Sequence, residues 1–416
     1  MKKKRLIILT IIASVILLLC LGFYIAWRVS LDKYEDTGLP KLEITVDGKI
    51  SSKESYVDCY VSVTNTEERY ELSHIKGAVR GRGNTTWSYP KKPYRLKLDE
   101  KISFFGEEKN KSWVLLAMYN DYSLSKDALA FTLGASLENG DYVPSLHYVD
   151  LYINGEYTGL YALTEQVNEN KGRVDVQADI SQEDTEIPFL VEIDDYIEDD
   201  GGIEGKDYFK IGDANYVIKY PDAGDGLTQA QLEYVKSYIL NAHNLINKKG
   251  VTVNELSQYI DVDSFIDYYL VQELMIQTEV KYKSVYMSKL SNGKLKMGPL
   301  WDYDWALDGP SLLRWFTYEA PLEDYSSKGA WFYTLLAGSY EFRMTVKTRW
   351  QELEAKVRQA TADFEASRDY ILKGAKKNWL KWYWYNPWAD YEKCFEKTIT
   401  TLKNRIDWLD NKIDNY

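Results

Sequence analysis

Two carboxylates two residues apart, Asp302 and Asp304, stand among aromatic residues in the segment Trp301–Trp305. The apolar stretch before them predicts a strand, and alternation along a strand places both aspartates on one face and the rings on the other. Paired carboxylates suit a hard cation such as Mg²⁺, which takes oxygen ligands and usually bridges to substrate phosphates. An Asp-x-Asp pair also occurs in solvated turns, so its surroundings decide between the two interpretations.

A glycine-rich segment and a basic strand lie far upstream of this acid pair. The first is Arg80–Trp87, which contains Arg82, and the second is Lys91–Leu98, in which Arg95 and Lys97 share one face. Backbone N–H groups of a glycine turn and neighbouring cations both favour anions, so the two segments form a candidate phosphate cradle. A plain hairpin with a solvated charged face fits the same pattern.

The elements that position these residues favour strands in the first half of the chain. Val57–Val63 alternates apolar and polar residues, as a half-buried strand does. Tyr148–Tyr161 predicts a hairpin, because Asn154-Gly155 between apolar runs favours a type I′ turn. Further strands are expected over Trp113–Leu116 and Phe189–Asp194.

From Gly226 the pattern becomes helical. Helices are predicted over Leu227–Lys248 and Val262–Thr278, with Asp263 as the N-cap of the second. A hairpin over Ser284–Leu300 follows and delivers Asp302 at its exit. The remaining chain is expected to be mainly helical and rich in aromatic residues, from Trp331 to a terminal helix near Tyr391–Ile413.

The N-terminus predicts a membrane anchor. Lys2–Arg5 precede the uncharged, mostly apolar run Leu6–Trp27, which is close to the ~20 residues that span a bilayer. The basic cluster favours a cytoplasmic tip at 1–5, an anchor at 6–27 and a tether at 28–39, with the main domain outside the cell membrane. We therefore expect a single-pass protein of the cell membrane, and a cleaved signal peptide is the rival interpretation.

Composition excludes several classes of function. The formal charge is −12 over 416 residues, and removing the four basic residues of the tip leaves −16, which argues against nucleic acid as a partner. Cys59 and Cys394 are far apart, so no disulfide framework is expected. His74, His147 and His243 are scattered, which argues against histidine-dependent hydrolysis.

The order of these features matches the needs of phosphoryl transfer. A strand-rich half with a glycine turn and a basic strand, followed by a helical half with acids on a hairpin, places a cleft between two lobes. In kinase sites a catalytic acid and an amide ligand stand five residues apart, upstream of the metal-binding Asp. Glu279 and Ser284 show this spacing ahead of Asp302.

Several motifs in one order carry a resemblance to the CotH family, the spore-coat-protein-H-like kinases. The resemblance implies an α+β, bilobal, atypical protein-kinase-like domain over 40–416, with an N-lobe to about 195 and a C-lobe beyond it. It also implies ATP and Mg²⁺ as cofactors and phosphate transfer to serine or threonine of a protein. The motifs are RGRGNTTW with KKPYRLKL (80–98), SWVLLAMYND (112–121), VDLYINGEYTGLYALTEQV (149–167), FLVEIDD (189–195), VIKYPD (217–222), and KSVYM through GPLWDYDWA (283–306).

The resemblance also implies roles for single residues. Asp302 matches the metal-binding Asp of the family's Trp-Asp-aromatic-Asp motif, and Asp304 is its second acid. Arg82, Lys92 and Arg95 belong to the segments for which nucleotide or phosphate contact is expected.

Three further positions complete the expected site. Glu165 ends the Gly-Leu-Tyr strand, near the place of a kinase hinge. Glu279 stands where many relatives have the catalytic Asp, and Ser284, a candidate metal ligand, stands where some have Asn. The longer Glu side chain shifts its carboxylate by ~1 Å, and misplacement on that scale lowers rates by ~10²-fold.

Two functions from different classes follow. The first is a membrane-anchored, extracytoplasmic kinase that acts on a Ser/Thr-rich surface or coat protein. The second is a pseudokinase-like binding or assembly protein, in which Glu279 and Ser284 mark weakened catalysis. A glycoside hydrolase fits less well, because Asp302 and Asp304 are too close in sequence to flank a glycosidic bond.

Overall fold

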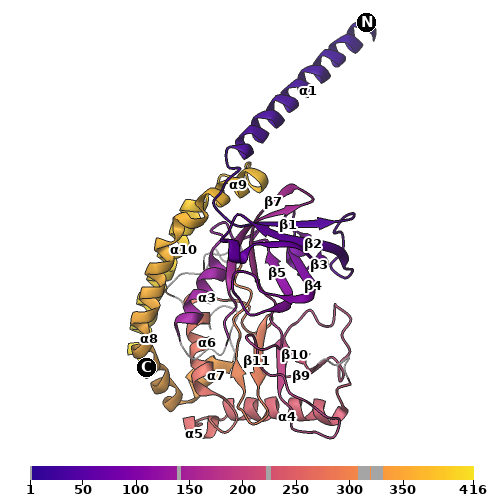
Figure 1. Ribbon diagram of the computed structural model, residues 1–416. Coiled ribbons are helices and arrows are strands. Elements are labelled where there is room, and N and C mark those ends of the chain that lie inside the picture. Colours follow the sequence, from indigo (N-terminus) through magenta and orange to yellow (C-terminus); the bar gives the residue numbers. More distant parts are fainter. Residues whose placement is uncertain (1, 138–141, 222–225, 308–318, 320–330) are drawn as a thin grey trace.

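The computed structural model describes residues 2–137, 142–221, 226–307, 319 and 331–416. Helix α1 (Lys2–Asp32) projects away from the rest of the molecule (Figure 1). Its part Thr10–Asp32 is long and apolar enough to cross a membrane, and it is the one such helix within the described residues. The predicted anchor at 6–27 therefore lies within a single continuous helix.

A closed barrel of seven strands follows α1 in the described chain. Strand β1 closes it by pairing antiparallel with β2 on one side and parallel with β6 on the other. The strands follow the order β1-β2-β3-β4-β5-β7-β6 around the barrel. They are β1 (Lys41–Val46), β2 (Val57–Thr64), β3 (Leu72–Gly81), β4 (Tyr94–Ile102), β5 (Asn110–Leu116), β6 (Leu146–Ile153) and β7 (Glu156–Glu165).

Local patterns explain the barrel strands. The alternation predicted over Val57–Val63 is confirmed, since Cys59, Val61 and Val63 point into the barrel core. The hairpin of β6 and β7 is also confirmed, and Asn154 and Gly155 both have positive φ, as a type I′ turn requires. The Asn154 side chain accepts a hydrogen bond from Val46 N–H, which ties this turn to β1.

A second sheet of five antiparallel strands lies below the barrel in Figure 1. Its central strand β8 is buried along its whole length, which explains its continuous apolar sequence. The strands follow the order β12-β11-β8-β10-β9. They are β8 (Phe189–Ile193), β9 (Tyr208–Ile211), β10 (Ala214–Tyr220), β11 (Val285–Lys289) and β12 (Lys296–Met297).

Helices cover the second sheet and one side of the barrel. The long helices α8 and α10 run side by side along the left of Figure 1. This arrangement confirms an α+β protein with a strand-rich N-terminal region and a helical C-terminal region. The principal helices are α3 (Lys126–Ser136), α4 (Gln229–Ile246), α5 (Val253–Leu256), α6 (Val262–Met275), α7 (Trp331–Gly338), α8 (Tyr340–Ala366), α9 (Leu372–Trp382) and α10 (Tyr391–Asp414).

Helix α6 corrects one sequence prediction. Its N-cap is Asp261, whose carboxylate accepts a hydrogen bond from Ser264 N–H at 3.0 Å. Asp263 was the predicted cap, but it lies in the first helical turn, where its own φ and ψ are helical. The helix also ends at Met275 rather than at Thr278, because Ile276 takes a left-handed conformation with φ of 51°.

The segment after β12 corrects a second sequence prediction. The predicted hairpin is present, but β12 ends at Met297 and Trp301–Leu307 is not a strand. Pro299 lacks an N–H group and cannot continue the ladder of hydrogen bonds. Strand alternation is therefore the wrong explanation for the placement of Asp302, whose φ of 69° marks a left-handed turn.

Candidate active site

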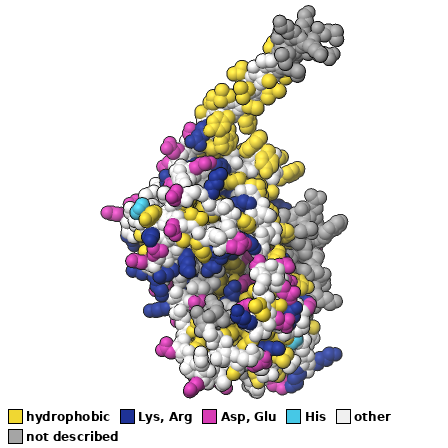
Figure 2. All heavy atoms as spheres, turned by 90° about the vertical axis from the view of Figure 1, so that its right-hand side faces the viewer, with side chains coloured by type: hydrophobic (Ala, Val, Ile, Leu, Met, Phe, Trp, Pro, Cys, Tyr) yellow, Lys and Arg dark blue, Asp and Glu magenta, His cyan; other side chains and the backbone are white. Residues whose placement is uncertain are grey.

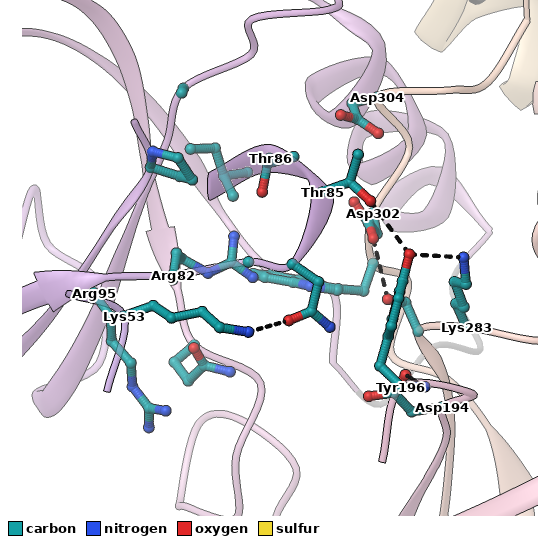
Figure 3. Close-up of a pocket in the computed structure, with 18 of the residues that line it drawn as sticks. Lys53, Arg82, Thr85, Thr86, Arg95, Asp194, Tyr196, Lys283, Asp302 and Asp304 are labelled. Atoms are coloured by element: carbon teal, nitrogen blue, oxygen red, sulfur yellow. Dashed lines mark hydrogen bonds between the residues drawn. The ribbon is translucent and has the colours of Figure 1, made fainter. Parts of the chain in front are cut away.

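A cavity of about 1120 Å³ separates the barrel from the second sheet. The barrel contributes the ends of β3, β4 and β5 together with the turn that contains α2 (Thr85–Ser88). The second sheet contributes β8, β10 and β11, and the segment Trp301–Trp305 closes one end. Figure 3 shows side chains from both halves pointing into this space.

Four carboxyl side chains line one end of the cavity: those of Asp127, Glu279, Asp302 and Asp304. Ser284 Oγ donates a hydrogen bond to Asp302 Oδ2 at 3.2 Å. The next residue, Tyr303, donates its N–H to Asp127 Oδ1 at 2.7 Å. The turn therefore directs Asp302 and Asp304 into the cavity although it is not a strand, and Tyr303 remains buried behind them.

Burial and mutual repulsion perturb these acids. Burial raises the pKa of Asp302, while Arg82 and the Ser284 hydroxyl oppose the increase. The pKa of Asp304 lies well above its usual range, first through burial and then through the charges of Asp302 and Asp127. Burial also raises the pKa of Glu279. A cation bound among these groups would relieve their repulsion.

Arginine side chains line the barrel wall of the same cavity. Arg82 lies with its guanidinium 5.6 Å from the centre of the Trp301 ring, and burial lowers its pKa while Asp302 raises it. The Nε atoms of Arg80 and Arg95 are buried and have no hydrogen-bond partner among the described residues. Guanidinium groups whose Nε donor is buried without a partner suit an anionic ligand such as phosphate.

Gly83 allows the turn between these arginines and α2 to form. Its φ is +77°, and a Cβ atom there would lie 2.0 Å from Thr86 Oγ1. Glycine is therefore required for this conformation at this position. The close approach of the Gly83 backbone to the Thr86 side chain agrees with the glycine turn that the sequence predicts within Arg80–Trp87.

Contacts across the cavity mouth join the glycine turn to the acidic loop after β8. The Tyr196 and Thr85 hydroxyl groups lie 3.2 Å apart, and Lys283 Nζ donates to the Tyr196 hydroxyl at 3.2 Å (Figure 3). Lys53 Nζ contacts Asn84 Oδ1 at 2.7 Å and Asp200 Oδ1 at 3.4 Å. The acidic loop after β8 thus forms part of the cavity wall.

Two predicted site residues lie elsewhere. Lys92 Nζ donates to the Trp87 carbonyl at 2.6 Å, and Glu165 accepts hydrogen bonds from the N–H and hydroxyl of Ser145. Neither side chain lines the cavity. Their contact with a nucleotide stays a prediction, whereas Arg82, Arg95, Glu279, Ser284, Asp302 and Asp304 are brought together as expected.

Several cavity residues had no role in the sequence prediction. Asp127 contacts Tyr303 across 176 positions of sequence, so no local pattern indicates it. Lys219 forms an ion pair of 3.0 Å with Glu192 on the neighbouring strand. Lys283 was within reach of sequence reasoning, because it stands four residues after Glu279 and lies 3.4 Å from it.

A comparison with protein families decides the relationship. The family model described as CotH kinase protein matches residues 79–410. The chain belongs to the CotH family. The match runs from β3 to α10 and covers the lining of the cavity in this CotH protein except Lys53, Glu54 and Tyr56. No curated protein matches the chain.

Proposed function

We propose that this CotH protein is a membrane-anchored, extracytoplasmic kinase that transfers the γ-phosphate of ATP to serine or threonine of a surface or coat protein. The observation that carries the proposal is the cavity itself, which opposes the arginines of the barrel to the acids of Trp301–Trp305. Its volume of about 1120 Å³ is sufficient for a nucleotide. In this proposal the barrel acts as the N-lobe of a kinase-like fold, and the second sheet with its helices acts as the C-lobe. Strand β8 then belongs to the C-lobe, so the boundary between the lobes lies before it and not near residue 195.

The end of the cavity that carries the carboxylates fits a Mg²⁺ ion whose coordination shell is completed by the substrate. Among the described residues, no three His, Cys, Asp or Glu side chains converge to hold an ion by themselves. Mg²⁺ usually takes one or two carboxylates and fills its other positions with water and phosphate oxygens. Asp302 and Asp304 would hold it, and Mg²⁺ would supply charge neutralisation at the phosphates.

Glu279 is the proposed general base. Its side chain lines the cavity with Asp302 and Asp304, and burial, followed by the charge of Asp302, raises its pKa, which makes the carboxylate a stronger base. Its carboxylate would accept a hydrogen bond from the attacking hydroxyl. Lys283, 3.4 Å from Glu279 Oε1, orients the carboxylate and links it to Tyr196 at the cavity mouth.

The part of the cavity wall near the end of β5 offers a site for the adenine ring of the nucleotide. Leu116, Met118 and Tyr119 line the cavity where β5 ends. The Tyr119 ring stacks on Tyr89 with centroids 5.4 Å apart. Apolar and aromatic side chains are the usual surroundings of a planar ligand, so we place adenine here, with its phosphates toward Arg82.

A pseudokinase-like binding protein is the second candidate. Glu279 is engaged by Lys283, and Ser284 donates its hydroxyl to Asp302. Contacts of Tyr196 also cross the cavity mouth. These contacts would allow nucleotide to bind while turnover is slow.

The decisive experiment measures binding and transfer separately on the full chain in lipid nanodiscs. ATP with Mg²⁺ at 100 times its Kd should stabilise the domain by about 2.7 kcal/mol in a thermal-shift titration. Labelled phosphate should pass from ATP to a Ser/Thr-rich protein, and Asp302→Asn should lower the rate by roughly 100-fold or more. Asp58→Asn in β2 serves as the matched control, because this side chain is exposed and does not line the cavity.

Each outcome separates the candidates. Binding without transfer supports the pseudokinase-like protein, and absence of both binding and transfer rejects both proposals. If Asp302→Asn transfers phosphate as fast as Asp58→Asn, Asp302 does not hold the metal.

Replacing the proposed base gives a second prediction. Glu279→Gln keeps the size of the side chain but cannot accept a proton, so kcat should fall by roughly 10²- to 10⁴-fold. ATP affinity in the thermal-shift titration should change little, because the loss lies in the transition state. Glu71→Gln, at an exposed position that does not line the cavity, is the control. Equal kcat values for the two variants would remove Glu279 from the mechanism.

A further inference from the structure

An exposed aromatic surface stands beside the end of α1. Its members are Trp384 and Tyr385, which follow α9, together with Trp388. Trp388 is 82% exposed, the largest value among the exposed large apolar side chains of the described residues, and Tyr385 is 62% exposed. Figure 2 shows hydrophobic side chains gathered where α1 meets the rest of the molecule. A packing role in the core does not explain side chains that are this exposed.

This surface is physically continuous with the apolar helix. The Phe23 ring of α1 lies 5.2 Å from the Trp384 ring, and Trp384 in turn packs edge-on against Tyr385 at 5.7 Å. Trp27 Nε1 donates a hydrogen bond of 2.7 Å to the Leu380 carbonyl of α9. Two independent contacts therefore fix the aromatic surface against the last turns of α1.

We propose that Trp384, Tyr385 and Trp388 lie in the interfacial region of the lipid bilayer and fix how the domain is oriented on the membrane. The inference rests on the membrane anchoring proposed above. Phe23 precedes Trp27 by four residues, which corresponds to ~6 Å along a helix. The predicted anchor ends at Trp27, so Trp384 beside Phe23 lies ~6 Å inside the outer edge of the hydrocarbon core. Interfacial apolar side chains are buried to this depth, ~5–10 Å below the boundary between headgroups and acyl chains.

The chemistry of the surface also matches this region. Tryptophan and tyrosine are enriched at membrane–water interfaces, since their rings are apolar and their N–H and O–H groups remain in contact with water. Arg28 is exposed and directly follows Trp27, where its guanidinium can reach lipid phosphates. A sugar polymer or protein bound at the same surface would have to displace the bilayer that surrounds α1, so we commit to lipid as the occupant.

Site-directed fluorescence on the full chain tests the inference. An environment-sensitive NBD label is placed on Trp388→Cys, with Tyr385→Cys as a second reporter, in a background with Cys20→Ser and Cys394→Ser; Cys59 is buried. Tyr340→Cys at the start of α8, where the native side chain is 66% exposed, is the matched control. Native Cys20, labelled alone in a Cys394→Ser chain, reports separately on α1.

Labelled proteins are placed singly in phosphatidylcholine–phosphatidylglycerol nanodiscs with quencher lipids. Labels at 388 and 385 should be quenched by lipid spin labels at a shallow position, and aqueous iodide should quench them roughly threefold less than the label at 340. The label on Cys20 should respond to the deep spin label.

The outcomes distinguish the inference from the anchoring on which it rests. Deep quenching at Cys20 with free iodide access at both 388 and 385 overturns the aromatic contact and leaves the anchor intact. Absence of quenching at Cys20 overturns both. Protection at 388 that requires high protein concentration, and not lipid, would assign the surface to a second copy of the chain and overturn the inference.

Discussion

Asp302 is constrained from several sides at once. Its φ of 69° is strained for a residue with a side chain, and such strain persists only where the surroundings hold it. Gln277 donates its side-chain N–H to the Asp302 carbonyl, and Ser284 donates to its carboxylate. The carboxylate is therefore positioned before any ligand arrives, which is a condition for efficient electrostatic catalysis.

Asp194 gives a pH-dependent prediction at the same scale. Burial, followed by the charge of Glu192, raises its pKa from 3.8 to about 6. The folded state then binds more protons than the unfolded state between about pH 4 and pH 6, so stability falls as pH rises through this range. Asp194→Asn removes that loss and keeps an acceptor for the Tyr196 N–H.

We expect Asp194→Asn to be more stable than the native chain at pH 7.5, by up to about 3 kcal/mol, and equally stable near pH 4. Urea unfolding of the full chain in micelles at both pH values measures the difference. A gain that is the same at the two pH values would show that ionisation of Asp194 is not its cause.

The residue types of the site were predictable, but their mutual placement was not. Asp302, Asp304, Glu279 and Arg95 carry chemical types and spacings that sequence alone displays, and the cavity contains all four. Asp127 reaches the same cavity only because α3 packs near the Trp301–Trp305 turn, and that proximity has no local signature. The sequence predicts Lys92 as a site residue, but its ammonium group donates to the Trp87 carbonyl instead of lining the cavity. Nothing in the local charge pattern indicates that contact.

At the scale of elements, the start of α6 matters because this helix leads to the segment that carries Glu279. Asp261→Ala removes the hydrogen bond to Ser264 N–H and should cost about 1 kcal/mol. Asp263→Ala, two residues later, removes only a favourable charge in the first turn and should cost about 0.3 kcal/mol. Urea midpoints of the two variants provide the comparison, and an equal or larger loss in Asp263→Ala would contradict the cap.

Elements with local signals were predictable and their pairings were not. The Asn154-Gly155 turn and the N-terminal apolar run specify their own structures within a short stretch of sequence. Placement of β8 between β10 and β11 depends on a strand more than ninety positions away, since Ile193 pairs with Val285. The early end of β12 depends on Pro299, which strand alternation alone does not take into account.

At the scale of the whole molecule, a buried ion pair joins the last helix to the middle of the chain. Arg405 of α10 and Glu273 of α6 are fully buried, with Arg405 Nη2 3.0 Å from Glu273 Oε1. Arg405 Nε also donates to the Glu273 carbonyl at 2.8 Å. Glu273 lies six positions before the cavity residue Glu279, so this ion pair fixes α10 against the helix that leads to the cavity.

Arg405→Met should destabilise the folded chain by about 3–5 kcal/mol, because it leaves a buried carboxylate without its main partner. Adding Glu273→Gln should restore part of the loss. The matched control is Arg368→Met, which breaks surface pairs with Asp369 and Glu396 and should cost less than about 1 kcal/mol. Thermal unfolding of the three variants measures their losses of stability. A loss in Arg405→Met no larger than that in Arg368→Met would contradict the stabilising role of the buried ion pair.

The parallel pairing of β1 with β6 governs the order in which the chain completes its fold. Lys41 pairs with Asp150, 109 positions later, so β1 leaves the ribosome long before its second partner. β2 covers one edge of β1 early, while the other edge keeps its N–H and C=O groups unpaired until β6 arrives. The newly made chain therefore carries an unpaired strand edge until β6 has been synthesised, and such an edge favours aggregation during folding.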